Sequence, residues 1–162
     1  MTLSELASLA EITGLILVIA SLIYLARQIR QSTAMMQVSV SSERLQRETD
    51  IVNDIVRSRE VAEYWAKGAA EFESLDEVDK QRMIFFERRA LLHWHSMYGL
   101  RQQNLVSDAD WHELKWVIRN IGFRQSIRAS WAAFREGYED SFQNFIDQQF
   151  LLADEETANK DL

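Results

Sequence analysis

The chain has 162 residues, a formal net charge of −7, no cysteine, no proline and five glycines. The lack of cysteine excludes disulfides, thiolate zinc sites, iron–sulfur clusters and a cysteine nucleophile. An acidic chain without clustered lysine and arginine lacks the positive surface that phosphate backbones require, so nucleic acid is not expected as a partner. Because proline is absent and glycine is rare, nothing interrupts long helices, and the composition predicts an all-α fold.

The N-terminal segment is the most apolar part of the chain. Residues 12–26 carry no charge, and residues 6–26 contain only Glu11. A membrane-spanning helix needs about 20 mostly apolar residues, so residues 1–28 are predicted to form a transmembrane anchor. A cleaved signal peptide would have basic residues before the apolar run, whereas here Arg27 and Arg30 follow it. A soluble core helix is disfavoured because the run is apolar around its whole circumference.

The basic residues beside this segment predict its orientation. No lysine or arginine precedes the span, while Arg27 and Arg30 follow it directly. The positive-inside rule therefore places the C-terminal part in the cytoplasm and the N-terminus outside, with lipid around the span. Tyr24 lies near the inner end, where an aromatic side chain suits the membrane interface.

Residues 29–152 are predicted to form a helical cytoplasmic domain. The apolar pattern of the anchor continues to about Arg57, so the first helix is expected to end there. A short second helix is expected to end near Gly68. Ser74 and Glu77 have the spacing of a capping box, which predicts the start of a central helix over about 75–103.

The central helix carries apolar residues on more than one face, which predicts packing on two sides. Ser107 is expected to cap the next helix and Gly122 to end it. Two further helical segments follow, one around Ile127 and Trp131 and one from 141 to 150. Residues 153–162 are acidic and lack a periodic apolar face, so they are predicted to be a disordered tail.

Parts of the chain resemble an uncharacterised family of bacterial single-span membrane proteins. The resemblance rests on residues 11–14 (Glu-Ile-Thr-Gly), on residues 20–33 (ASLIYLARQIRQST), and on later runs at 122–125 (Gly-Phe-Arg-Gln) and 142–145 (Phe-Gln-Asn-Phe). The chain has Ser126 and Ile127 where the family has a tryptophan pair. The resemblance implies a bacterial inner-membrane location and a helical domain, and it implies no activity.

One stripe of the anchor combines small residues with the acidic residue. Its members recur at spacings of 4, 3, 4, 3 and 4, which defines a heptad seam: Ala7, Glu11, Gly14, Val18, Ser21 and Leu25. Small residues let helices approach closely in a membrane, so the seam predicts self-association of the anchor. An acid within a span is costly and is a functional candidate, the alternative being that Glu11 lies at the outer headgroups.

No constellation of residues specifies a reaction or a cofactor. His93 and His95 point about 200° apart on a helix, so they do not form a shared metal site. The cluster Asp108, Asp110, His112 and Glu113 is explained by acids at a helix start, and it lacks metal-motif spacing. The tryptophans are expected in the core, with Trp65, Trp94 and Trp116 as candidates to face a protein partner.

The sequence therefore favours a membrane-anchored helical scaffold or adaptor, not an enzyme, which self-associates as a homo-oligomer or joins a membrane complex. The alternative is a homo-oligomeric, cation-selective channel in which Glu11 rings the outer mouth and the rest of the seam lines the path. A membrane-bound, metal-dependent hydrolase using the cluster around Asp110 is a third and more distant alternative.

Overall fold

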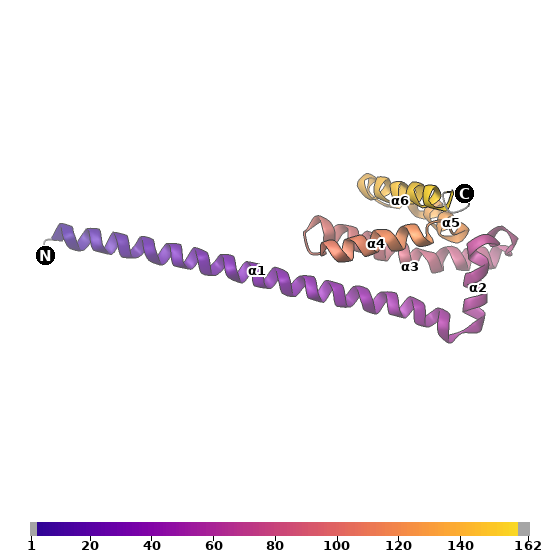
Figure 1. Cartoon of the computed structure of the whole chain (residues 1–162), viewed down its shortest axis with the longest axis horizontal. Coiled ribbons are helices and arrows are strands. Elements are labelled where there is room, and N and C mark those ends of the chain that lie inside the picture. Colours follow the sequence, from indigo (N-terminus) through magenta and orange to yellow (C-terminus); the bar gives the residue numbers. More distant parts are fainter. Residues whose placement is uncertain (1–2, 159–162) are drawn as a thin grey trace. The chain divides into compact units, whose positions relative to one another are not determined.

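The computed structural model describes residues 3–158, except for the side chains of residues 3, 5 and 7–10. This part of the chain forms six α-helices and two short 3-10 helices and contains no strand, which confirms the all-α prediction (Figure 1). The chain divides into two units, Met1–Ser39 and Val40–Leu162. The predicted domain start at residue 29 therefore precedes the start of the compact unit at Val40.

The first unit is a single helical segment, the N-terminal part of α1 (Leu3–Arg57). The end of this helix at Arg57 confirms the boundary predicted from the apolar pattern. Helix α1 continues without a break through Ser41 and Ser42 because the chain offers no proline or glycine there to interrupt the backbone hydrogen bonds.

The second unit consists of the end of α1 and all later helices. Ser58 caps α2 (Arg59–Ala70), which is followed by η1 (Phe72–Ser74), α3 (Glu77–Gln102) and α4 (Asp108–Ile121). The chain then forms α5 (Gln125–Phe134), η2 (Arg135–Gly137) and α6 (Asp140–Ala158). Helix α5 packs against α2 and α3, and α6 packs against α4.

The core lies among α3, α4, α5 and α6. Its buried apolar residues are Leu91, Trp94, Met97, Val106, Leu114, Ile118, Ile127, Trp131, Phe142, Ile146 and Phe150. From α1, Val40 packs against this cluster. The aromatic members contribute large buried areas, and ring pairs such as Trp131 and Phe142 meet edge to face at 5.9 Å.

Two helix starts show how local capping decides a boundary. The Ser107 hydroxyl accepts a hydrogen bond from the Asp110 backbone N–H at 3.1 Å, which confirms the predicted cap of α4. The predicted capping box at Ser74 is wrong. The Ser74 hydroxyl donates to the Glu71 carbonyl within a 3-10 turn, and Asp76 caps α3 by accepting from the Asp79 N–H at 2.8 Å.

The predicted disorder from residue 153 is also wrong as far as Ala158. Helix α6 continues to that residue, and Ala153 is buried. Two arginines hold the acidic segment: Arg128 bonds Asp154 at 2.7 Å and Arg119 bonds Glu156 at 3.0 Å. Residues 159–162 of the predicted tail lie outside the described residues.

Candidate interaction surfaces

The apolar segment of α1 is fully unburied in the isolated chain. An 18-residue window of this helix has a mean hydropathy of 1.9, and none of that window is buried. Large side chains such as Leu15, Ile19 and Leu22 are exposed. By length and composition the helix can cross a membrane, and its exposure does not fit a core helix of a soluble protein.

The described part of the predicted seam is equally open. Glu11, Val18 and Leu25 are exposed, and a Cβ added at Gly14 would meet no atom within 4 Å. The Ser21 hydroxyl donates to the Leu17 carbonyl at 2.8 Å, so its hydrogen bond is made within the helix and does not require water. The side chain of Ala7 lies outside the described residues. The seam thus offers a narrow, small-residue strip that a second helix can approach.

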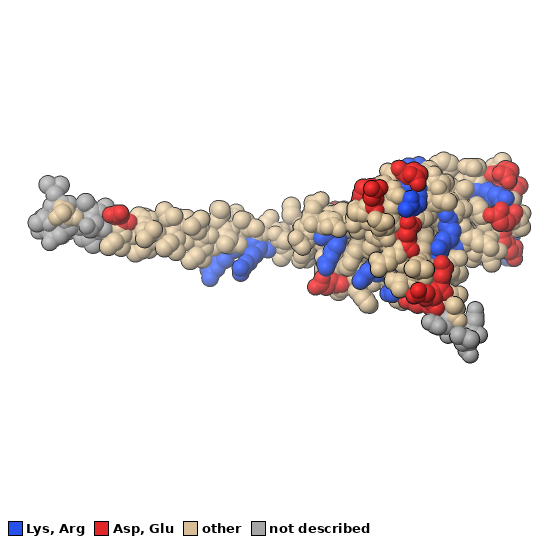
Figure 2. All heavy atoms as spheres, turned by 90° about the horizontal axis from the view of Figure 1, so that it is seen from above, with Lys and Arg blue, Asp and Glu red and all other residues tan. Residues whose placement is uncertain are grey.

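Arg27 and Arg30 follow the apolar segment and are exposed. Over the second unit, acidic and basic side chains are interspersed on the face that Figure 2 shows, without an extended basic area. The basic pair is therefore a local feature beside the apolar segment.

Within the second unit, Arg44 ties the last part of α1 to α4. Only 3% of its side chain is exposed, and its guanidinium bonds Glu113 at 2.7 Å, Asp110 at 3.2 Å and Glu48 at 3.3 Å. Ser41 adds a hydrogen bond to Asp110 at 3.1 Å. Three carboxylates around one buried guanidinium satisfy its charge, so this cluster fixes the helix end against the domain.

The acidic and histidine groups noted in the sequence take structural partners. Asp108 bonds Arg101 at 2.8 Å, while His112 is exposed. His93 approaches Glu48 at 3.8 Å and His95 bonds Glu139 at 2.8 Å, so the two imidazoles serve different contacts, as their spacing predicts. Across the described residues, no group of three or more such side chains is arranged to hold a metal ion.

A buried ion pair that no pattern in the sequence predicts joins three helices. The Arg124 Nε lies 3.4 Å from the Glu87 Oε1 of α3, and both side chains are 4% exposed. Ser126 donates to the same carboxylate oxygen at 2.7 Å. The guanidinium also donates to the Trp65 carbonyl of α2, and its Cζ lies 3.7 Å from the centroid of that ring. The only sequence signal was the position of Arg124 within the run at 122–125.

The environment of Arg124 explains the direction of its pKa. Burial lowers the pKa of this guanidinium, and the charge and hydrogen bonds of Glu87 offset that effect in part. Because an arginine remains protonated in proteins, the pair is a permanent buried charge pair and not a proton-transfer group. Its role is to hold α2, α3 and α5 together.

The three tryptophans expected to face a partner differ in exposure. Trp94 is 2% exposed within the core, so the prediction that it faces a partner is wrong. Trp65 is half-buried, and the guanidinium of Arg124 covers its ring. Trp116 is 56% exposed, and with Phe123 it lines a depression of about 230 Å³ beside the end of α6. Trp116 alone among the three presents a large free aromatic surface.

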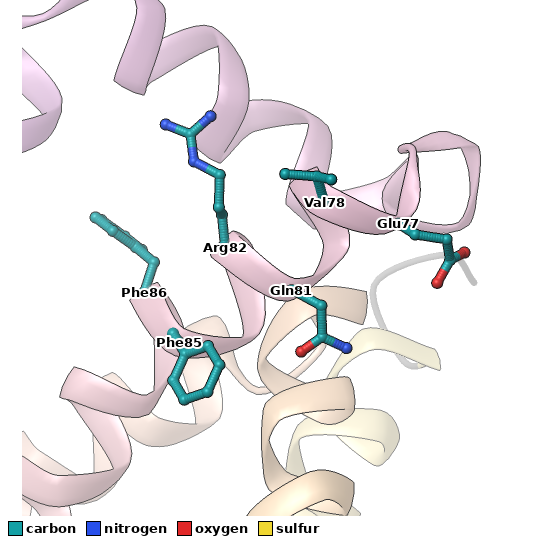
Figure 3. A pocket seen from close by; sticks show the side chains of 6 residues that line it. All are labelled: Glu77, Val78, Gln81, Arg82, Phe85 and Phe86. Carbon is teal, nitrogen blue, oxygen red and sulfur yellow. The ribbon is translucent and has the colours of Figure 1, made fainter.

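The first turns of α3 expose a larger apolar patch. Val78, Phe85 and Leu92 recur every seven residues and are all exposed, so the predicted packing of α3 on two sides leaves out this stripe. Phe85 and Phe86 project from α3 beside Val78 and Arg82 (Figure 3), where they line a shallow depression of about 710 Å³. The sequence could not distinguish this stripe from core because the helix carries apolar residues on more than one face.

A second depression adjoins this patch and shares Arg82 and Phe86 with it. It has a volume of about 390 Å³ and lies between the end of α1, the start of α2 and α3. Together the two depressions form one continuous surface on the side of the second unit where α1 ends. We call this surface the α3 patch.

Comparisons with protein-family models, with curated proteins and with solved structures give no match. Three features of the chain itself bear on its function: the unburied apolar helix, the basic residues Arg27 and Arg30 that follow it, and the α3 patch.

Proposed function

We propose that the protein is a membrane-anchored helical scaffold or adaptor of the bacterial inner membrane. The span localises the chain and associates with copies of itself, and the cytoplasmic domain presents helix surfaces to other proteins. The observation that carries the proposal is the N-terminal helix, whose apolar window has a mean hydropathy of 1.9 and is wholly unburied. In water such a surface would be strongly unfavourable, and lipid is the environment that it suits.

The flanking charges support the orientation. Arg27 and Arg30 lie at the C-terminal side of the span, and no basic residue precedes it. The arginines retain the cytoplasmic position on insertion, so the second unit is cytoplasmic and the N-terminus is outside. The resemblance to bacterial single-span proteins supports the same location.

The seam supports self-association. Gly14 leaves open space on the helix surface, and the Ser21 hydroxyl is already bonded within its own helix. Two backbones can therefore approach closely along this strip, which favours packing in lipid, where no hydrophobic force drives helices together. A shared interior would also place Glu11 away from lipid tails.

The α3 patch supports a protein partner for the domain. It lies beside Arg57, about 25 Å along α1 from Val40 at a rise of 1.5 Å per residue. Exposed apolar side chains bordered by Arg82 and Glu77 have the composition of a protein contact, with an apolar centre and a charged rim. We infer that the partner contributes an apolar surface.

The mass of the intact complex, extracted from membranes into detergent or nanodiscs, tests this proposal. We expect more than one copy of the chain in the complex. Replacing Gly14 by leucine fills the space between the backbones and is expected to reduce the number of copies. The matched control Ile16→Ala removes side-chain volume from the opposite side of the helix, about 200° around from Gly14, and is expected to leave the mass unchanged.

Two results would overturn the proposal. If the chain is recovered from the soluble fraction, it is not a membrane anchor. If the wild type is a monomer with no other chain bound, it is neither self-associated nor an adaptor. A closed ring of identical chains, in which Glu11→Gln lowers cation conductance while keeping the ring, would replace the adaptor by the channel.

A further inference from the structure

The part of α1 within the second unit carries a second unpartnered stripe. Leu45, Val52 and Val56 are 53%, 55% and 76% exposed, and Ser42 before them and Thr49 between Leu45 and Val52 are also exposed. The opposite side of the same helix faces the domain through Arg44, Glu48 and Ile51. We call the five exposed residues the α1 stripe.

The spacing within the α1 stripe is that of a coiled coil. Its members follow one another at 3, 4, 3 and 4 residues, with Ser42, Thr49 and Val56 at one heptad position and Leu45 and Val52 at the other. The Thr49 hydroxyl donates to the Leu45 carbonyl at 2.7 Å, so Thr49 turns no unmet hydrogen-bond donor toward a partner. A helix that buries this stripe gains apolar contacts, and at Thr49 it leaves no hydroxyl without a hydrogen bond.

In the sequence, the same register continues toward the span. Val38 and Met35 precede Ser42 at the spacings that continue the heptad, and both are exposed. Steps of seven from Ser42 lead through Met35 and residue 28 to Ser21 and Gly14, which are the small residues of the seam. The register from 35 to 56 therefore covers three heptads, the length at which a heptad pattern predicts a coiled coil.

We propose that the α1 stripe is the interface for a second copy of this chain, which forms a parallel two-stranded coiled coil below the membrane. This inference deepens the proposed function and rests on its self-association. Because each copy is anchored through the same end of α1, two copies are held parallel and in the same register, and their effective concentration is high. No other helix is brought to the stripe in that way.

The charges beside the α1 stripe fit an identical partner. Gln46 and Asn53 border it on the free side and are uncharged, so two copies meet without like charges at this edge. On the other side Glu48 is engaged by Arg44 at 3.3 Å. A copy of the chain can therefore dock without placing two free carboxylates opposite one another.

Disulfide crosslinking between copies tests the interface, and the cysteine-free chain gives a clean background. Leu45→Cys and Val52→Cys are introduced singly into the full chain. The variants are oxidised in native membranes with copper-phenanthroline, and oxygen accepts the electrons released when two thiols form a disulfide. In a parallel coiled coil these positions face their equivalents within the short Cα distance that a disulfide needs. We expect a covalent dimer at both positions. The matched controls Arg47→Cys and Asp50→Cys, on the exposed surface away from the stripe, are expected to remain monomeric.

A non-covalent test uses Leu45→Glu with Val52→Glu. Both side chains are exposed, so thermal unfolding of the variant should match that of the wild type, while the fraction of dimer is expected to fall. Equal crosslinking at stripe and control positions would overturn the inference, since it reports random collision. So would crosslinking at Ser21→Cys without any at Leu45 or Val52, a result that leaves the proposed function standing. If no position crosslinks and the complex is monomeric and without other chains, both proposals fail.

Discussion

Arg124 is a buried charged residue that contacts two other helices of the domain. It is the N-cap residue of α5, and it pairs with Glu87 of α3 while its guanidinium stacks on Trp65 of α2. Both charged groups are almost fully buried, so each relies on the other for compensation. A buried pair of this kind contributes little against an apolar replacement of both partners, but breaking it leaves one charge unpaired.

We therefore expect Arg124→Ala to reduce the free energy of unfolding by about 3–5 kcal/mol. The loss comes from leaving the Glu87 carboxylate buried without its cation. Thermal unfolding of the full chain in detergent, followed by far-UV circular dichroism, measures the change. Arg119→Ala is the matched control, since it breaks the more exposed pair with Glu156 and should cost at most about 1 kcal/mol. Similar losses in the two variants would show that the Arg124 pair is well solvated.

For single residues, the sequence predicted the roles that depend only on neighbouring positions in the chain. Ser107 was identifiable because a cap needs only its own helix start. Ser74 was not, because Asp76 lies two residues later and is an equally suitable cap. Trp94 and Trp116 look alike in sequence, and only the packing of distant helices makes one buried and the other exposed. Arg124 and Glu87 are 37 residues apart, so no local pattern could pair them.

The contact between α2 and α5 depends on a residue without a side chain. A Cβ added at Gly68 would lie 3.0 Å from the Ser126 hydroxyl oxygen and 3.3 Å from the terminal methyl of Met83. Ser126 is itself held by the buried Glu87, so it cannot easily move aside. Glycine is needed here for the close approach of two helices.

Gly68→Ala is accordingly expected to destabilise the domain by about 1–3 kcal/mol, because the added methyl group overpacks a filled contact. Gly99 provides the control within α3, since a Cβ there would meet nothing within 4 Å. Gly99→Ala should instead stabilise by about 0.5–1 kcal/mol through its helix preference. Urea unfolding of both variants measures the two shifts, and a shift of the same sign in both would contradict the packing argument.

The helices themselves were largely predictable, and their surroundings were less so. The absence of proline and the clear periodicity of apolar residues indicated where α1, α4 and α5 run. The last part of α6 was missed because its acidic residues suggest a solvated tail, whereas Arg119 and Arg128 from distant helices hold it in place. The exposed stripe of α3 was missed for the opposite reason, since apolar residues on more than one face of a helix resemble core.

For the molecule as a whole, the sequence predicted one long apolar helix followed by a helical domain. That prediction succeeded because hydropathy is a property of the segment alone and needs no tertiary information. The start of the compact unit at Val40 depends instead on Arg44 meeting Asp110 and Glu113. These partners lie more than sixty residues away, and no pattern around Arg44 identifies them.

Under the proposed membrane anchorage, Arg27 and Arg30 are expected to control the orientation of the whole molecule. Because Arg27 and Arg30 alone flank the span, a reporter fused after Leu162 is expected to be active only in its cytoplasmic form. Introducing Leu3→Lys and Ser4→Lys places equal basic charge before the span, so the two orientations should become similar in energy and both should be populated. Fusion of paired cytoplasmic and periplasmic reporters measures the ratio of the two orientations.

Substituting Leu3 and Ser4 by glutamine is the control, since it adds polarity without positive charge and should keep the original orientation. Periplasmic activity of the unmodified fusion would reverse the assignment and would place the α3 patch outside the cell.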